Sequence, residues 1–342
     1  MKRPGKLLLV LIVVVVLAIC FGAAYNALAL HRLQNAHPVP GAFYTVDGHR
    51  MHLYCTGTGS PAVVLEAGLG DDWIYWQKVQ PEIAKTTRIC SYDRAGLGWS
   101  DPQSPRQDAP VISSHLHSLL QAAHEAGPFI FVGASAGGFY VRQYFSKFPA
   151  DLAGVVLVDS SVPEQLTVFP GRMDTPENRR KRHRDANSQW LREITGYARI
   201  TGHCNGDVEK GLENYAPLVA AETCRPTFTT AWLPEYDAFW ASADEAARAH
   251  CCGDVPLFII SQDPDRPKDG WDAQSIAQQP MWSQLQDNLK RLSPHSRRII
   301  AKLSGHHVMI DRPDVVIDGI QHVITDVRRH QPDPQDGTTI RQ

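Results

Sequence analysis

Short apolar runs alternate with helical patterns along most of the chain after residue 40. The runs are rich in Val, Ile, Leu and aromatic residues and are bounded by Gly, Pro or Asp, which is typical of buried strands. Because helical patterns separate most of the runs, we expect an α/β fold with a mostly parallel sheet and helices on both faces. The predicted strands are 43–46, 50–55, 62–66, 87–92, 128–132, 154–158, 255–261 and 298–303.

The interval 161–252 interrupts this alternation, because it is mostly polar, rich in Arg, Asn, Glu and Trp, and contains no clear strand. A structureless connection of this length would be unusual in a compact domain. We therefore predict a mainly helical cap over the ends of the strands. The expected parts of the chain are an N-terminal anchor and linker (1–36), a core in two pieces (37–160 and 253–330), the cap, and a polar tail (331–342).

The first residues have the pattern of a membrane anchor. Basic residues at the start precede an unbroken apolar run over 7–24. A run of about 18 residues exceeds the usual apolar core of a secretory signal and fits a spanning helix. The basic end predicts a single-pass anchor with the rest of the chain outside the cytoplasm. The alternative is a signal peptide cut at Ala-Leu-Ala (27–29), which would leave a secreted or periplasmic protein.

Composition narrows the functional classes. The formal net charge is −2 and 43% of the residues are hydrophobic, so the chain can bury a large core and nothing indicates nucleic-acid binding. The spacing of Cys and His fits no zinc site, so we expect neither a metal nor a cofactor. The expected partners are a small molecule and, through the N-terminal helix, the membrane. The sequence indicates no particular oligomeric state.

Six cysteines lie beyond the apolar run, and their compartment would be oxidising. Cys55 and Cys90 lie on strands that could be neighbours, and Cys204 and Cys224 share one irregular segment. Both pairs are plausible disulfides, with buried free thiols as the alternative. The sequence predicts no pairing for Cys251 and Cys252.

The most informative motif is Gly-Ala-Ser-Ala-Gly at 133–137, between a predicted strand and a predicted helix. Glycines on both sides of Ser135 let the backbone turn sharply, which would lift the hydroxyl out of the sheet at the start of the helix. The pattern alone is weak, because a Gly-rich turn without chemistry can produce it. An acyl-transfer serine also needs a base, an acid and N–H donors for the oxyanion.

Candidates for the base and the acid follow later strands. His306 comes directly after a strand and a glycine, and we expect it to be the base, with its neighbour His307 pointing elsewhere. For the acid we favour Asp265, which follows the strand 255–261 in the better register. Asp159, at the end of the strand after the serine, and Asp263 are the alternatives. Any of the three could accept the second imidazole N–H and hold the required tautomer.

The oxyanion would need two backbone donors. One is the N–H of Ala136, directly after the serine. The other is expected from Leu69, where Gly68 and Gly70 let the chain approach closely.

Together these motifs resemble the α/β-hydrolase superfamily over about residues 40–327. Glu-Ala-Gly-Leu-Gly (66–70) resembles an oxyanion loop found in one bacterial branch. The segment 91–101 resembles the D-R-x-G-x-G-x-S-D stretch, and 304–306 with Asp-Arg-Pro (311–313) resembles the histidine loop. The chain departs from the pattern at 262–265, which lacks the usual glycine of the acid loop. The resemblance implies eight strands, a cap between the sixth and seventh, and a metal-free Ser-Asp/Glu-His triad.

The expected function is therefore that of a membrane-anchored serine hydrolase that cleaves a carboxylic ester through an acyl-enzyme. An Asp nucleophile, which epoxide or haloalkane hydrolysis needs, is absent at position 135. Amide, thioester or peptide cleavage and acyl transfer by the same triad are alternatives. A non-catalytic binding protein on the same scaffold is another.

Overall fold

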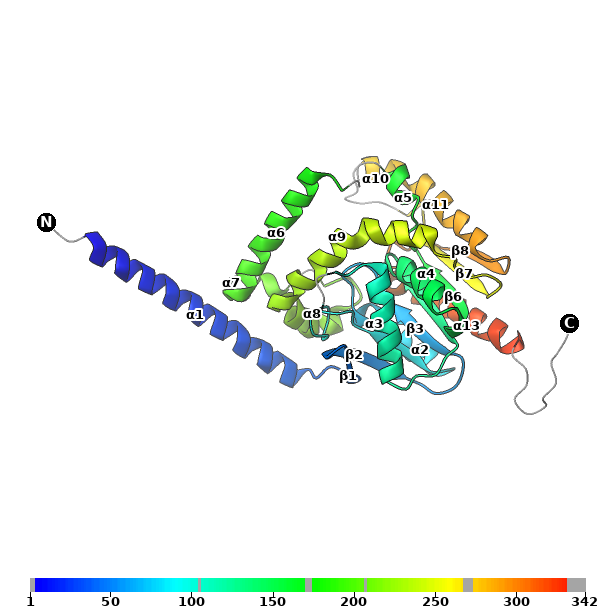
Figure 1. The fold of residues 1–342 in the computed structure, drawn as a ribbon, viewed down its shortest axis with the longest axis horizontal. Coiled ribbons are helices and arrows are strands. Elements are labelled where there is room, and N and C mark those ends of the chain that lie inside the picture. Colours follow the sequence, from blue (N-terminus) through cyan, green and yellow to red (C-terminus); the bar gives the residue numbers. More distant parts are fainter. Residues whose placement is uncertain (1–3, 104–105, 170–173, 206–207, 267–272, 331–342) are drawn as a thin grey trace. The chain divides into compact units, whose positions relative to one another are not determined.

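The structure is a computed structural model that describes residues 4–103, 106–169, 174–205, 208–266 and 273–330. Its centre is an eight-stranded sheet in the order β1-β2-β4-β3-β5-β6-β7-β8. Figure 1 shows helices in front of and behind this sheet. The first hairpin and the β2–β4 pair are antiparallel, and the other pairs are parallel. The expected α/β fold is confirmed. The strands are β1 (Ala42–Val46), β2 (His49–Thr56), β3 (Ala62–Glu66), β4 (Ile89–Tyr92), β5 (Phe129–Ala134), β6 (Leu152–Val158), β7 (Leu257–Gln262) and β8 (Ser296–Ala301).

Helices cover both faces of this sheet. Val155 packs in one apolar cluster with Leu119 of α3 and Tyr144 of α4. The preceding residue, Gly154, faces α13, because a Cβ there would lie 2.5 Å from Val323 Cγ1. Neighbouring residues of a strand point to opposite faces, so these helices lie on opposite sides. The longer helices packed with the sheet are α3 (Ala109–Ala122), α4 (Gly137–Lys147), α11 (Gln279–Asn288) and α13 (Pro313–His330).

Shorter elements connect these layers around the sheet. They are η1 (Trp73–Trp76), α2 (Gln80–Ile83), η2 (Pro149–Asp151), α5 (Gln165–Val168), α10 (Ala273–Ala277), η6 (Leu289–Leu292) and α12 (Val308–Asp311).

Contacts divide the chain into two compact units. One contains the sheet and comprises residues 41–174 and 234–342. The other comprises residues 1–40 and 175–233. The second unit contains α1 (Pro4–Ala36), α6 (Pro176–Ile194), α7 (Tyr197–Ile200), η4 (His203–Asn205), η5 (Glu213–Tyr215), α8 (Ala216–Thr223) and the first part of α9 (Pro226–Arg248).

The expected helical insertion lies between β6 and β7, and the described part of it contains no strand. The cap was expected to span 161–252, but only residues 175–233 of this insertion belong to the second unit. The second part of α9 belongs with the sheet: Ser242 Oγ accepts a hydrogen bond from Ala109 N–H at 3.0 Å, and the Phe239 ring packs against Phe139. The expected tail, 331–342, lies outside the described residues.

Three disulfides link cysteines of the described chain. Cys55–Cys90 and Cys204–Cys224 confirm the two expected pairs, and free thiols at these positions are excluded. The third links the adjacent residues Cys251 and Cys252, which the sequence did not predict. Cys55 and Cys90 stand directly opposite each other on β2 and β4, so this bond fastens the antiparallel edge to the rest of the sheet.

Replacing Cys55 and Cys90 together by Ser is expected to lower the free energy of unfolding. The bond closes a loop with a sequence separation of 35 residues, and the lost restraint on the unfolded chain corresponds to about 3–4 kcal/mol. Denaturant titration of the full chain in detergent measures this change. Cys20→Ser is the control, because Cys20 is free and exposed. Equal stability of the double variant and the control would contradict the expected role.

Candidate active site

Ser135 stands on the turn between β5 and α4, with a positive φ of 49°. Its N–H donates to Val158 O on β6 at 3.1 Å, which ties the turn to the neighbouring strand. The flanking glycines are required by close approach: a Cβ at Gly133 would lie 2.9 Å from Gly137 O, and one at Gly137 would lie 2.5 Å from Glu66 O. The strained turn therefore holds the serine at the carboxyl edge of the sheet, at the start of α4.

His306 lies next to this serine, on the loop after β8. Its Nε2 is 2.9 Å from Ser135 Oγ. The neighbouring His307 turns away, with its ring edge-on to Tyr75 and its Nε2 3.9 Å from Asp71 Oδ2. The structure thus brings together the expected serine and the expected histidine.

Asp159 completes the hydrogen-bonded chain. Its Oδ2 accepts from His306 Nδ1 at 2.6 Å, and its side chain is fully buried at 0% exposure. The other oxygen, Oδ1, accepts from Gln262 N–H at 3.0 Å and from Trp282 Nε1 at 2.9 Å. The carboxylate is therefore fixed by three donors. An imidazole held at Nδ1 in this way presents an unprotonated Nε2 to the serine hydroxyl.

The expectation that Asp265 holds the imidazole is wrong, and the cause is the path of the chain after β7. Asp263 accepts from Leu303 N–H at 2.9 Å and from Lys302 Nζ at 3.1 Å. These bonds, with the one from Asp263 N–H to Ser304 O at 3.2 Å, tie the turn to the segment after β8. Asp265 is consequently 81% exposed and interacts with Lys302 Nζ at 3.3 Å.

Asp263 does not contact the imidazole either, since its carboxylate is engaged by Leu303 and Lys302. The hydrogen bonds to these donors hold the pKa of Asp263 below its usual value, against the opposing effect of burial. Asp159, which the sequence left as an alternative, is the carboxylate at His306.

Comparison with known proteins bears on the fold. A family model described as the alpha/beta hydrolase fold matches residues 61–195. An uncharacterized Bacillus subtilis (strain 168) protein, YqjL, is 24% identical over 276 residues, which is 80% of this chain and 87% of that protein. An AB hydrolase superfamily protein of Gibberella zeae is 24% identical over 296 residues, covering 78% of this chain and 87% of that protein.

Solved structures of other proteins have a similar fold. A thermophilic esterase from Thermogutta terrifontis superimposes with a TM-score of 0.55 at 19% identity, over 84% of this chain and 99% of that one. The Cif epoxide hydrolase from Acinetobacter nosocomialis gives a TM-score of 0.66 at 14% identity, over 88% and 96% of the two chains. The chain has the α/β-hydrolase fold. The resemblance read from the motifs is confirmed at the level of the fold.

In this α/β-hydrolase fold the loop after β3 lies against the serine. A Cβ at Gly68 would be 3.2 Å from Ser135 Cβ, so only glycine permits this approach without displacement. Leu69 packs against the apolar cluster that contains Ala136. The two residues expected to donate to an oxyanion therefore belong to one packed region next to the serine turn.

A buried guanidinium holds this loop in place. Arg94 Nη1 donates to Glu66 Oε1 at 2.8 Å and to Ala67 O at 3.0 Å. Its Nη2 donates to Gly68 O and, at 2.9 Å, to Glu235 Oε1. The three charged side chains are 3% exposed or less. Charged donors fixing consecutive carbonyls leave the loop few alternative conformations.

Glu235 comes from α9 and reaches the same loop from the other end. Its Oε1 accepts from Gly70 N–H at 3.3 Å and from Tyr140 OH at 3.0 Å. Sequence reasoning missed this residue, because nothing in the polar insertion marks one glutamate among many. Glu66 and Arg94 were visible in motifs, but their pairing was not.

Burial raises the pKa of Glu66 from 4.5 to about 7, against the opposing effects of Arg94 and of the hydrogen bond from Tyr92 OH at 2.5 Å. One guanidinium faces two carboxylates here, and the nearby charge of Glu235 also disfavours ionisation of Glu66. The folded protein therefore holds a proton at this position in a range where the unfolded chain has released it.

This shift predicts a pH dependence of stability. Between pH 4.5 and about 7 Glu66 binds more protons in the folded than in the unfolded state, so its contribution to the free energy of unfolding falls as the pH rises through that window. Glu66→Gln, which is neutral throughout, should remove the fall. Thermal unfolding of both proteins across the window measures it. Glu82→Gln, on an exposed side chain, is the control. Parallel curves for wild type and Glu66→Gln would refute the shift.

Proposed function

We propose that this protein is a serine hydrolase that cleaves a carboxylic ester, with Ser135 as nucleophile, His306 as base and Asp159 as the acid that orients it. The observation that carries the proposal is the continuous hydrogen-bonded chain from Ser135 Oγ through both imidazole nitrogens to a fully buried carboxylate. The chain has the residue types, the order and the contact distances that acyl transfer requires.

The chemistry proceeds in two halves. Ser135 Oγ attacks the ester carbon while its proton passes to His306 Nε2, which gives a tetrahedral oxyanion. Collapse breaks the bond to the alcohol oxygen, and the alcohol leaves with the proton from Nε2. Water then attacks the acyl-enzyme by the same route, and the acid is released. Asp159 stays ionised and stabilises the imidazolium formed in each half.

The N–H groups of Leu69 and Ala136 are proposed to bind the oxyanion. The proposal is supported by the position of the Gly68 loop against Ser135 and by the start of α4 at the serine turn. The N-terminus of a helix carries partial positive charge, which favours an anion there. Arg94, by holding the loop carbonyls, positions the loop without touching the substrate.

Ester cleavage is favoured over epoxide opening by the residue on the turn. The fold neighbours include both an esterase and epoxide hydrolases, so the fold leaves the reaction open. This chain has Ser, not Asp, at position 135. A serine paired with a histidine forms an acyl-enzyme from a carboxylic ester.

A membrane location outside the cytoplasm is proposed for the enzyme. Residues 6–36 form a helix long and apolar enough to cross a membrane. The basic residues before the span favour a cytoplasmic N-terminus. The disulfides support an oxidising compartment for the rest of the chain.

Ser135→Ala is expected to abolish covalent labelling of the full chain by a fluorophosphonate probe and to reduce hydrolysis of p-nitrophenyl esters by about 10³-fold or more. Intact mass measures labelling, and release of p-nitrophenol from esters of increasing chain length measures turnover. Ser146→Ala, at an exposed position of α4, should label like wild type. A folded wild type that neither labels nor hydrolyses esters would favour the non-catalytic alternative.

Asp159→Asn is expected to slow labelling by about 10³–10⁴-fold. The amide oxygen can still accept from Gln262 N–H and Trp282 Nε1, which keeps the fold. The amide NH₂ would then face Nδ1 and select the tautomer whose Nε2 carries the proton and cannot act as base. Asp265→Asn is the matched control and should change the rate little. Slow labelling in the control with a normal rate in Asp159→Asn would reverse the assignment.

A further inference from the structure

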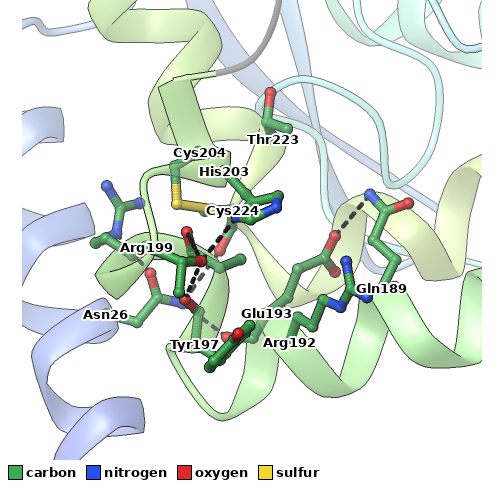
Figure 2. Close-up of a disulfide and its surroundings, with 12 residues drawn as sticks. Asn26, Gln189, Arg192, Glu193, Tyr197, Arg199, His203, Cys204, Thr223 and Cys224 are labelled. Atoms are coloured by element: carbon green, nitrogen blue, oxygen red, sulfur yellow. Dashed lines mark hydrogen bonds between the residues drawn. A yellow bond between two sulfur atoms is a disulfide. The ribbon is translucent and has the colours of Figure 1, made fainter.

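The C-terminal part of α1 is built into the unit formed by residues 1–40 and 175–233. Asn26, which closely follows the apolar run over 7–24, is only 4% exposed. Its Nδ2 donates to Glu193 O at 3.0 Å and to Cys224 O at 3.1 Å, and its Oδ1 accepts from Arg199 Nε at 2.7 Å (Figure 2). The amide therefore joins α1 to three separate elements.

One turn earlier, the backbone of α1 touches the same unit. A Cβ on Gly22 would clash with Thr195 O, and one on Gly196 would clash with Gly22 O. Gly196 also has a φ of 70°, which favours glycine. Two glycines without side chains thus allow the helix and the α6–α7 turn to meet backbone to backbone.

The length of the apolar run places this contact at the edge of a bilayer. A hydrocarbon core of about 30 Å takes about 20 helical residues at a rise of about 1.5 Å each. A span that begins at Leu7 therefore ends near Asn26. Asn26 therefore lies at the edge of the hydrocarbon core, and Gly22, one helical turn (about 6 Å) earlier, lies just inside it.

Several exposed apolar side chains belong to the helices that meet at this contact. Leu191, Tyr197 and Ile200 of the insertion are 52%, 54% and 59% exposed. Ile200 lies beside α1, with its Cδ1 3.7 Å from a Cβ built on Gly22. On α1 itself, Phe21 is 73% and Tyr25 is 45% exposed. Aromatic residues are enriched at membrane interfaces, where an apolar ring body and a polar tip are both accommodated.

We propose that Leu191, Tyr197 and Ile200 form, with Phe21 and Tyr25, a junction patch that inserts into the interfacial layer of the lipid bilayer, and that α1 is retained in the mature protein. The patch is continuous with the exposed apolar surface of α1, so the lipid that surrounds the helix is its natural partner. The inference rests on the proposed membrane location and is independent of the triad.

Retention of α1 follows from the same contacts. A cut after the Ala-Leu-Ala at 27–29 would remove both Gly22 and Asn26. The carbonyl of Cys224 and the guanidinium of Arg199 would lose the Asn26 amide, while Glu193 O would keep its hydrogen bond from Gly196 N–H at 3.1 Å. The loss of three hydrogen bonds at a side chain that is 4% exposed would destabilise the unit. The helix is thus part of the fold of this unit, in addition to being its anchor.

Intact mass tests retention. The full chain, purified from membranes in detergent, should have the mass of the uncut 38.0 kDa sequence. A mature protein that begins after residue 29 would overturn the proposal. Fluorophosphonate labelling of the same preparation reports on the triad separately, so failure of one proposal does not hide the other.

Fluorescence quenching tests the patch. In a Cys20→Ser background, an NBD fluorophore attached to Ile200→Cys is compared with one at Ala36→Cys, after reconstitution into phosphatidylcholine vesicles. Position 36 is exposed and, ten residues beyond Asn26 on α1, lies about 15 Å farther from the span. Lipids with a doxyl group near the headgroup should quench the label at 200 about twofold or more, while aqueous iodide quenches mainly the label at 36. Equal iodide quenching at both positions would overturn the patch.

Discussion

The buried guanidinium of Arg94 is the interaction on which the arrangement of the site depends. It lies between the carboxylates of Glu66 and Glu235 and also binds the carbonyls of Ala67 and Gly68. A buried charge that loses a partner is strongly destabilising, so the end of β3, the segment after β4 and α9 must meet in one way. The loop beside the serine is the product of that constraint.

The sheet supplies the second constraint. β5, β6, β7 and β8 are consecutive parallel neighbours, so their carboxyl ends share one edge. Ser135, Asp159 and His306 follow β5, β6 and β8, and the intervening β7 ends in Gln262, whose N–H donates to Asp159. The parallel strands thus bring three polar side chains close together, and the loops that follow the strands set only the final orientation of these side chains.

The unit formed by residues 1–40 and 175–233 is held together by different interactions. It has little apolar core of its own, and a disulfide between Cys204 and Cys224 with the Asn26 hydrogen bonds supplies much of its cohesion. An asparagine in an apolar helix is costly in lipid and favourable where backbone acceptors meet it. In the proposed membrane location, its burial marks where α1 leaves the lipid and becomes part of the unit.

Local patterns along the chain were enough to predict the strands, the sharp turn at Ser135 and the histidine after β8, because apolar periodicity and glycine act locally. The choice among Asp159, Asp263 and Asp265 belonged to the tertiary structure. All three follow strands that end at the same edge, but Lys302 and Leu303 engage the carboxylate of Asp263, whereas Asp159 accepts from the imidazole. The pairing of Arg94 with Glu235 of α9 likewise depends on the tertiary fold. These residues are 141 positions apart, and no local pattern in the sequence indicates that they form an ion pair.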